Sequence, residues 1–189
     1  TSSGTDALFV ALKAAGIEAG MKVAMPNLTF WATYEAIVQL GAKPVLIDVC
    51  ENTWQMDLEE LKKAHQNFFL DAVLFVHLFG WTCPRLKELR SFCKEASLPL
   101  IEDAAQAFGV KLEGQNVLKD AEIATLSFYP AKVIGGAGDG GAIVTKSPIL
   151  AEKCRSLINH GRSKHYSYRY VGWNARMSAV QADFLYQVL

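Results

Sequence analysis

The feature that most constrains the fold is a regular alternation of short apolar runs with amphipathic stretches along the chain. The clearest apolar run is residues 72–78 (AVLFVHL), which is typical of a strand covered on both faces in a parallel sheet. Residues 84–96 follow with apolar side chains at helical spacing, namely Leu86, Leu89, Phe92, Cys93 and Ala96. This alternation predicts an α/β fold, with a mostly parallel central sheet and helices on both faces.

The same pattern gives expected positions for the other elements. Strands are expected at residues 22–25, 44–49, 98–102, 123–128 and 141–145, and helices at 4–15, 31–40, 57–64, 148–158 and from 178 onward. Residues 159–170 are polar and are expected to form an exposed loop. Because no repeat or linker interrupts the pattern, we expect a single domain over residues 1–189.

Composition excludes several classes of partner. The chain has 189 residues and a formal net charge of zero, so it has no basic field that would attract nucleic acid or an anionic membrane. Its longest apolar stretch, residues 72–81, is much shorter than the ~20 residues of a membrane span. The four cysteines lack zinc spacing and are expected to be free thiols in a reducing compartment. We therefore expect a cytoplasmic protein without a metal site.

Polar residues of several kinds follow the predicted strands directly. They are Asp48, His77, Asp103, Ser127 and Lys132, and the start of the first helix adds Gly4 and Thr5. Open parallel sheets bind ligands at the carboxyl ends of their strands. An acid, a hydroxyl, an amine and a helix N-terminus are therefore expected to face one crevice.

Each of these residues also has a structural interpretation when taken alone. Asp103 begins the segment DAAQAF and could cap a helix there. Lys132 could be an ordinary solvated lysine, since lysines are rarely buried. His77 could be a hydrogen-bonded residue of the core. The functional interpretation depends on their order and shared edge.

Two other motifs favour different functions but lack the required context. Residues 136–141 fit Gly-x-Gly-x-x-Gly, yet they precede a strand, whereas the dinucleotide-binding motif follows one. We expect these glycines to form a loop that passes close to a ligand or a neighbouring chain. A hydrolase triad of Ser127, His77 and Asp103 is conceivable, but the serine lacks the flanking glycines of a nucleophile elbow.

Eight sequence blocks occur in an order that resembles a known family. They are SGTDAL (3–8), PNLTFWAT (26–33), VHLFG (76–80), IEDAAQAFG (101–109), SFYPAK (127–132), GDGGAIVT (138–145), NHGR (159–162) and GWNARMSAVQA (172–182). Together they resemble the DegT/DnrJ/EryC1/StrS family of sugar aminotransferases, which depend on pyridoxal 5'-phosphate (PLP) and have fold type I. The resemblance implies the large domain of a fold type I PLP-dependent transferase.

The resemblance implies a role for each residue near the cofactor ring. Lys132 would form a Schiff base with PLP and, once released, would move a proton; burial or nearby cations help such an amine to become neutral. Asp103 would pair with the pyridine nitrogen and preserve the ring as an electron sink. Gln106, one helical turn later, would form a hydrogen bond with the hydroxyl group of the cofactor ring. Phe30 would stack on the ring, with Trp31 as the alternative one residue away.

The resemblance also implies how the phosphate is bound. The backbone N–H groups of Gly4 and Thr5 would meet it at a helix N-terminus. The hydroxyl group of Ser127 would add another donor. Asn174 matches an asparagine that reaches the phosphate in the neighbouring subunit, which implies a homodimer with shared active sites.

The implied reaction moves an amino group from glutamate or glutamine to a nucleotide-linked keto-sugar in amino-sugar biosynthesis. Relatives with His in place of Lys132 resemble dehydratases, so Lys132 favours transamination. A sugar dehydratase, a cyclitol aminotransferase and a non-catalytic PLP-binding module remain alternatives. Because family members have further segments at both ends, residues 1–189 are expected to be a PLP-binding large domain truncated at both ends. By location alone, further candidate substrate contacts are Tyr129, His160, Arg162 and Tyr166.

Overall fold

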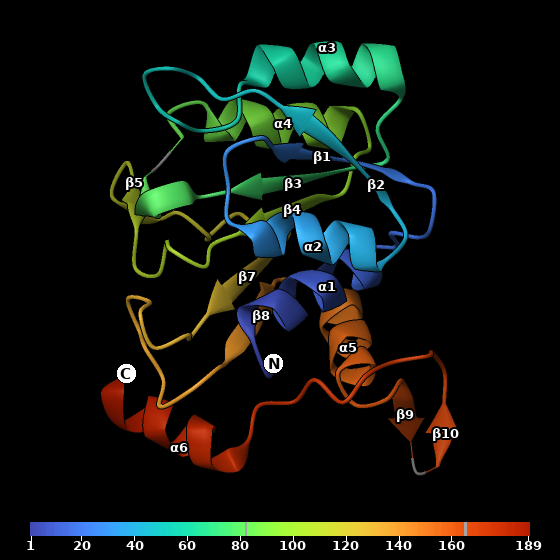
Figure 1. Cartoon of the computed structure of the whole chain (residues 1–189), viewed down its shortest axis with the longest axis vertical. Coiled ribbons are helices and arrows are strands. Elements are labelled where there is room, and N and C mark those ends of the chain that lie inside the picture. The colour runs from blue at the N-terminus through green and yellow to red at the C-terminus, as the bar shows by residue number, and fades with distance from the viewer. Residues whose placement is uncertain (82, 165) are drawn as a thin grey trace.

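The computed structural model describes residues 1–81, 83–164 and 166–189, and a six-stranded sheet forms its centre (Figure 1). In spatial order the strands are β2 (Lys43–Ile47), β1 (Lys22–Pro26), β3 (Ala72–Val76), β4 (Leu100–Asp103), β7 (Ile123–Ser127) and β8 (Gly141–Thr145). Neighbouring strands are parallel except at the β7–β8 edge, which is antiparallel. The predicted α/β fold with a mostly parallel sheet is confirmed.

Helices cover both faces of this sheet (Figure 1). They are α1 (Gly4–Ala14), α2 (Trp31–Gln39), α3 (Leu58–Phe68), α4 (Leu86–Glu95) and α5 (Pro148–Leu157), while α6 (Ala179–Val188) lies at the C-terminal end of the chain, away from the centre of the sheet (Figure 1). One apolar layer joins the sheet to α3 and α4, and a second joins it to α1, α2 and α5. Within β3, Val73 and Phe75 face the first layer while Ala72 and Leu74 face the second. This double coverage explains why the strand is apolar at every position.

Serine side chains begin three of the helices. The hydroxyl group of Ser3 accepts the N–H of Asp6 at 3.0 Å, which caps α1. Ser147 and Ser178 cap α5 and α6 in the same way. In the described residues no helix has both the length and the apolarity needed to cross a membrane.

Several local predictions differ from the structure. Helix α3 continues to Phe68, four residues beyond the expected end, and stops where Phe69 adopts a left-handed conformation. Strand β3 ends at Val76, and Leu78–Gly80 form a 3₁₀ turn, η1. The segment after Asp103 forms turns and not the helix that its sequence suggested.

Two short hairpins were not predicted. One pairs β5 (Lys111–Leu112) with β6 (Gln115–Asn116). The other pairs β9 (Arg162–Lys164) with β10 (Ser167–Tyr168) inside the expected exposed loop 159–170. Residues of β9 and β10 are exposed as expected, but the prediction of a loop without strands was wrong.

The glycine-rich loop at residues 135–141 passes close to other parts of the same chain. A Cβ atom on Gly141 would lie 2.4 Å from the carbonyl oxygen of Ser3, and one on Gly136 would lie 1.8 Å from Nε2 of Gln181. The Gln181 side chain donates to the Gly138 carbonyl at 2.9 Å. The close approach seen in this structure is made with the N-terminal segment and α6 of the same chain, whereas the sequence predicted one with a ligand or a neighbouring chain.

Candidate active site

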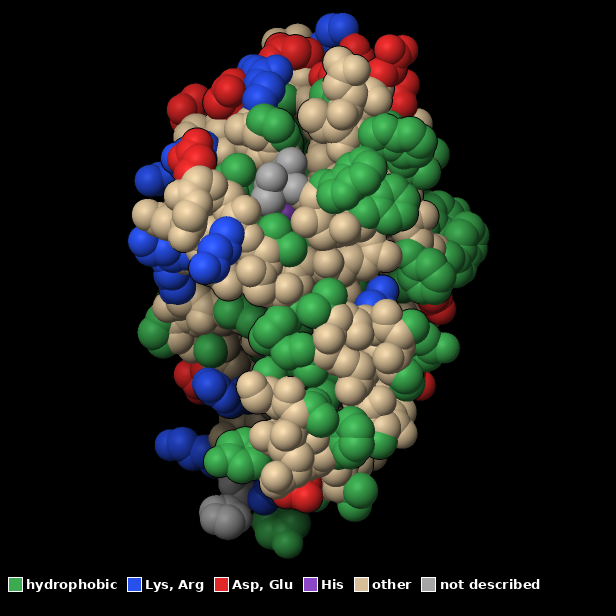
Figure 2. Space-filling view, turned by 90° about the vertical axis from the view of Figure 1, so that its left-hand side faces the viewer, with side chains coloured by type: hydrophobic (Ala, Val, Ile, Leu, Met, Phe, Trp, Pro, Cys, Tyr) green, Lys and Arg blue, Asp and Glu red, His purple; other side chains and the backbone are tan. Residues whose placement is uncertain are grey.

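A cavity of about 710 Å³ opens at the carboxyl ends of the strands. The heads of β3 and β4 point toward the side of the molecule that faces the viewer in Figure 2, where hydrophobic side chains gather among polar ones. The walls of the cavity come from the start of α1, residues 29–32, the β3–η1 junction, the turn after β4, and the end of β7 with the loop that follows. It therefore lies where parallel sheets bind ligands.

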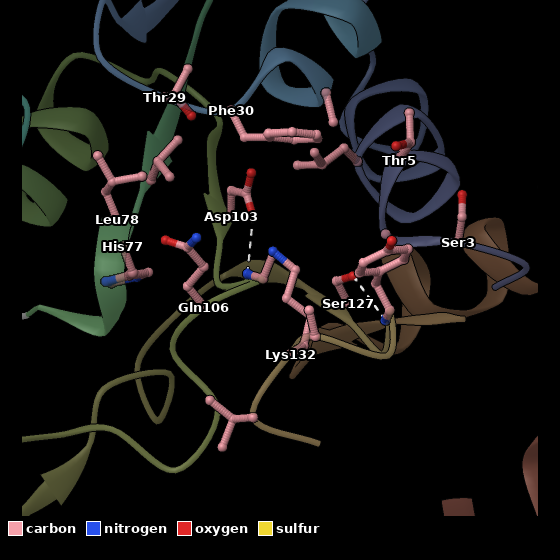
Figure 3. Close-up of a pocket in the computed structure, with 18 of the residues that line it drawn as sticks. Ser3, Thr5, Thr29, Phe30, His77, Leu78, Asp103, Gln106, Ser127 and Lys132 are labelled. Carbon is pink, nitrogen blue, oxygen red and sulfur yellow. Dashed lines mark hydrogen bonds between the residues drawn. The ribbon is translucent and has the colours of Figure 1, made fainter. Parts of the chain in front are cut away.

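The structure brings most of the predicted site residues to this cavity (Figure 3). Its lining includes Gly4, Thr5, Phe30, His77, Asp103, Gln106, Ser127, Tyr129 and Lys132. Asn174 lies outside it, exposed, and is bridged to Asn159. Asp48 is also outside and accepts a bond from the Asn27 amide. The candidates His160, Arg162 and Tyr166 are not among the described residues that line the cavity.

Asp103 places a nearly buried carboxylate at the base of the cavity. One oxygen accepts the N–H of Ala105 at 3.0 Å, and the other accepts the hydroxyl of Thr33 at 3.2 Å. Desolvation raises the pKa of this carboxyl group, although its hydrogen bonds and the charge of Lys132 act in the opposite direction. No ion pair involves Asp103 in the part of the chain that the structure describes. A protonated ring nitrogen would provide the cation that this carboxylate lacks.

The alternative interpretation of Asp103 as a helix cap does not hold, because turns follow it. The position expected for Gln106 one helical turn later is wrong for the same reason, yet the turn still directs its side chain into the cavity. Gln106 Oε1 accepts the backbone N–H of Phe79 at 2.6 Å. The amide nitrogen is consequently turned toward Asp103 and Lys132 (Figure 3). It can donate to an acceptor oxygen on a ligand.

Lys132 lies on the loop after β7, and its half-buried side chain extends into the cavity toward Asp103 (Figure 3). The lysine is close enough for its charge to lower the pKa of Asp103. This position differs from that of an ordinary solvated lysine. An amine and a carboxylate thus face the same space from the ends of β7 and β4.

The start of α1 and Ser127 form the opposite end of the cavity. Backbone N–H groups in the first turn of a helix have no partner within the helix, and here those of Gly4 and Thr5 lie at the cavity wall. The approach is tight, because a Cβ atom on Gly4 would lie 2.7 Å from that of Ser127. Two amides, a hydroxyl group and a helix N-terminus suit a phosphate group.

The two aromatic candidates take different positions. Phe30 lines the cavity, and 70% of its surface is exposed. Trp31 packs instead on Tyr34 of the same helix, with 4.8 Å between ring centroids. The structure therefore places Phe30, and not Trp31, where a ring-shaped ligand would be covered.

Some residues of the site were not found by sequence reasoning. Thr33 bonds Asp103, and its hydroxyl group is 2.8 Å from that of Thr29. Thr29 precedes α2 (Trp31–Gln39), so helical spacing gave no signal for this pair. Asp139 also lines the cavity. Sequence reasoning had no signal for the role of Phe79, because it is the backbone N–H of this residue, and not its side chain, that donates to Gln106. Among the described residues, no group of three or more His, Cys, Asp or Glu side chains is arranged to hold a metal ion.

This fold and its cavity place the chain in a recognised structural class. Solved structures with the same arrangement over nearly the whole chain are fold type I PLP-dependent aminotransferases. A sequence model of the DegT/DnrJ/EryC1/StrS aminotransferase family matches residues 1–189. The chain belongs to that family.

Individual relatives support the assignment. A UDP-N-acetyl-3-dehydro-alpha-D-glucosamine 3-aminotransferase of Acidithiobacillus ferrooxidans is 38% identical, covering 97% of this chain and 49% of the relative. The structure of DesV from S. venezuelae, in complex with a ketimine intermediate, has a TM-score of 0.93 and 38% identity, covering 98% of this chain and 50% of that one.

A second solved structure, ntda from Bacillus subtilis, was determined with bound cofactor pmp. Its TM-score is 0.90 and its identity 34%, covering 98% of this chain and 42% of that one. The chain thus spans about half the length of the relatives that it matches.

Proposed function

We propose that residues 1–189 form the PLP-binding large domain of an aminotransferase. The enzyme would move an amino group from glutamate or glutamine to a nucleotide-linked keto-sugar. The observation that carries this proposal is the Asp103 carboxylate, which is nearly buried, makes no ion pair with any described residue and shares one cavity with Lys132. Burial without a charged partner disfavours an ionised group, so its presence there is best explained by a cationic ligand.

Different residues of the cavity would contact different parts of the cofactor. When bound, PLP supplies an electron sink for a carbon atom that gains negative charge. Asp103 keeps the proton on the ring nitrogen, and the Gln106 amide donates to the ring oxygen. Lys132 would hold the cofactor covalently and, once released from it, would accept or return a proton at Nζ. Phe30 covers one face of the ring.

The phosphate of the cofactor would lie at the start of α1. Gly4 and Thr5 donate backbone N–H groups there, and Ser127 donates its hydroxyl group. Asn174 is exposed and outside its own cavity, which suits a donor to the phosphate in a second copy of the chain. We therefore propose a homodimer with shared sites, and the free cysteines suit a location in the reducing cytoplasm.

The proposed substrate class comes from relatives whose names specify nucleotide sugars. They include a UDP-sugar aminotransferase and a dTDP-sugar transaminase, each 38% identical to this chain. A volume of about 710 Å³ lies within the range of pockets that hold small ligands. Lys132 supplies the amine that transamination requires at this position.

The proposal is tested by adding PLP and then an amino donor while recording the visible absorbance. We expect the wild-type chain to bind PLP with a new absorbance band, which glutamate or glutamine then converts to the band of the aminated cofactor. Lys132→Ala should lose the first band. Lys146→Ala is the matched control, because Lys146 is exposed and paired with Asp120. Failure of the wild type to bind PLP would refute the proposal, and binding without conversion would leave only a PLP-binding module.

A further inference from the structure

A buried network of charged and polar side chains lies beside the cavity. Glu102 precedes Asp103 in β4, and because side chains alternate along a strand, it faces α4. Its two oxygens accept hydrogen bonds from Nε and Nη2 of Arg90, each at 2.8 Å. Nε2 of His77 lies 2.8 Å from Oε2 of Glu102, the same oxygen that accepts the hydrogen bond from Nη2 of Arg90. Arg90 also donates to the Val117 carbonyl at 2.7 Å, so the network joins α4, β3, β4 and the segment after β6.

The chemistry of the network determines which ring nitrogen of His77 carries a proton. Burial raises the pKa of Glu102, but its hydrogen bonds and charge interactions with His77 and Arg90 outweigh that effect and hold the pKa below its usual range. An ionised carboxylate only accepts hydrogen bonds. Nε2 of His77 must therefore donate to Glu102, which holds the imidazole ring in one orientation.

His77 is connected through the backbone to Gln106. The N–H of His77 donates to the carbonyl of Asp103 at 2.9 Å, and the next three residues form η1. In η1 the N–H of Phe79 donates to Gln106 Oε1. Phe79 has a φ of 59°, which a side-chain-bearing residue rarely adopts. This conformation needs support from surrounding contacts.

Close packing makes the turn sensitive to its neighbours. A Cβ atom on Gly80 would lie 2.7 Å from the carbonyl oxygen of Gln106, so the two backbone segments are in contact. A shift of His77 would therefore move the amide that orients Gln106. Rotation of the Gln106 side chain by half a turn would present its oxygen, and not its nitrogen, to the cavity.

We propose that Glu102, together with Arg90 and His77, is a positioning residue that holds η1 so that Gln106 directs its N–H donors into the cavity. The network thereby selects a ligand with an acceptor oxygen at this place. That this ligand is PLP rests on the proposed function. The orientation of Gln106 is independent of the proposed function, so the proposed function and this inference can fail separately.

The first test uses NMR on the protein without cofactor. Nitrogen-15 spectra of the wild type should show the His77 proton on Nε2, and Glu102→Gln should lose this preference and shift the Gln106 side-chain amide signals. Glu88→Gln is the matched control, since Glu88 is an exposed residue of α4 that pairs with Arg85. A folded Glu102→Gln protein with unchanged Gln106 signals would overturn the inference.

The second test measures PLP affinity in a double-mutant cycle. Glu102→Gln should weaken binding roughly tenfold in the wild-type background and have little further effect when Gln106 is already alanine. An equal loss in both backgrounds would show that the network acts elsewhere and overturn the inference. Absence of PLP binding by the wild type would refute the proposed function, and the NMR result would then decide the inference alone. If Glu102→Gln does not fold, Arg90→Lys replaces it, with the Gln106 amide signals and the PLP affinity as the readouts, because Glu102 still accepts the His77 proton in that variant.

Discussion

At the scale of single residues, the site combines groups that sequence could identify with groups that it could not. Asp103, Ser127 and Lys132 were found because charged or hydroxyl side chains follow apolar strands, and strand ends meet at one edge. Two hydrogen bonds of the site were not predicted, namely that from Thr33 to Asp103 and that from the backbone N–H of Phe79 to Gln106. They depend on how a helix and a turn are placed in space, which the sequence does not show.

The burial of Asp103 predicts a conflict between binding and stability. Below about pH 3.9 its carboxyl group is protonated in both folded and unfolded chains. As the pH rises, the unfolded chain ionises first because the folded pKa is raised, so the folded state loses stability. We expect cofactor-free Asp103→Asn to melt at a higher temperature than the wild type near neutral pH, with the difference vanishing in acid.

The same substitution should weaken PLP binding, since asparagine cannot balance the charge of the ring nitrogen. Thermal unfolding across the pH range and a PLP titration measure the two effects. Asp48→Asn is the control, because Asp48 also follows a strand but is exposed and outside the cavity. A cofactor-free Asp103→Asn protein that is less stable than the wild type at neutral pH would contradict this explanation.

At the scale of elements, periodicity predicted the six strands of the sheet and all six helices, but not every boundary. Long elements bury a face, and this leaves a pattern in the sequence. The β5–β6 and β9–β10 hairpins have two or three residues per strand and are largely exposed, so they leave none. The segment after Asp103 resembled a helix because it contains three alanines, which favour helices. In the structure two of them, Ala104 and Ala107, are buried within a turn.

The contact between α1 and β7 predicts the effect of a single methyl group. Gly4→Ala would place a Cβ atom 2.7 Å from that of Ser127 and force the helix away. We expect a loss of about 1–3 kcal/mol in unfolding free energy, and weaker PLP binding because the phosphate end is widened. Denaturant unfolding and PLP titration test this. The control is Gly138→Ala, where no atom lies within 4 Å of the added Cβ, and it should change neither the unfolding free energy nor PLP binding. Equal effects in Gly4→Ala and Gly138→Ala would contradict the argument.

At the scale of the whole molecule, two apolar layers cover the two faces of the sheet, and its carboxyl edge carries the cavity. Three of the four cysteines belong to these layers. Burial raises the pKa of Cys93 to about 12 and that of Cys154 to about 11, and also raises that of Cys83. Buried thiols of this kind react slowly because little thiolate forms.

Thiol reactivity should therefore report unfolding of the entire domain. Desolvation and the hydrogen bond that its thiol donates to Asp57 also raise the pKa of Cys50, so the contrast with the other thiols comes from exposure. At about pH 8, near the ordinary cysteine value, a thiol reagent should modify half-buried Cys50 slowly but first, and the other three cysteines only as the protein unfolds. Cys50→Ser should remove the early reaction and leave the later one. Rapid modification of all four thiols in the folded protein would contradict the two-layer core.

The central claim, that Lys132 holds PLP in the cavity opposite Asp103, is tested most directly by borohydride reduction of the PLP-loaded chain followed by peptide mapping. Reduction makes the link between amine and cofactor permanent, so its position can be read by mass spectrometry. We predict one phosphopyridoxyl group on the peptide that contains Lys132, and its loss in Lys132→Ala. A label spread over exposed lysines, or one unaffected by the substitution, would contradict the claim.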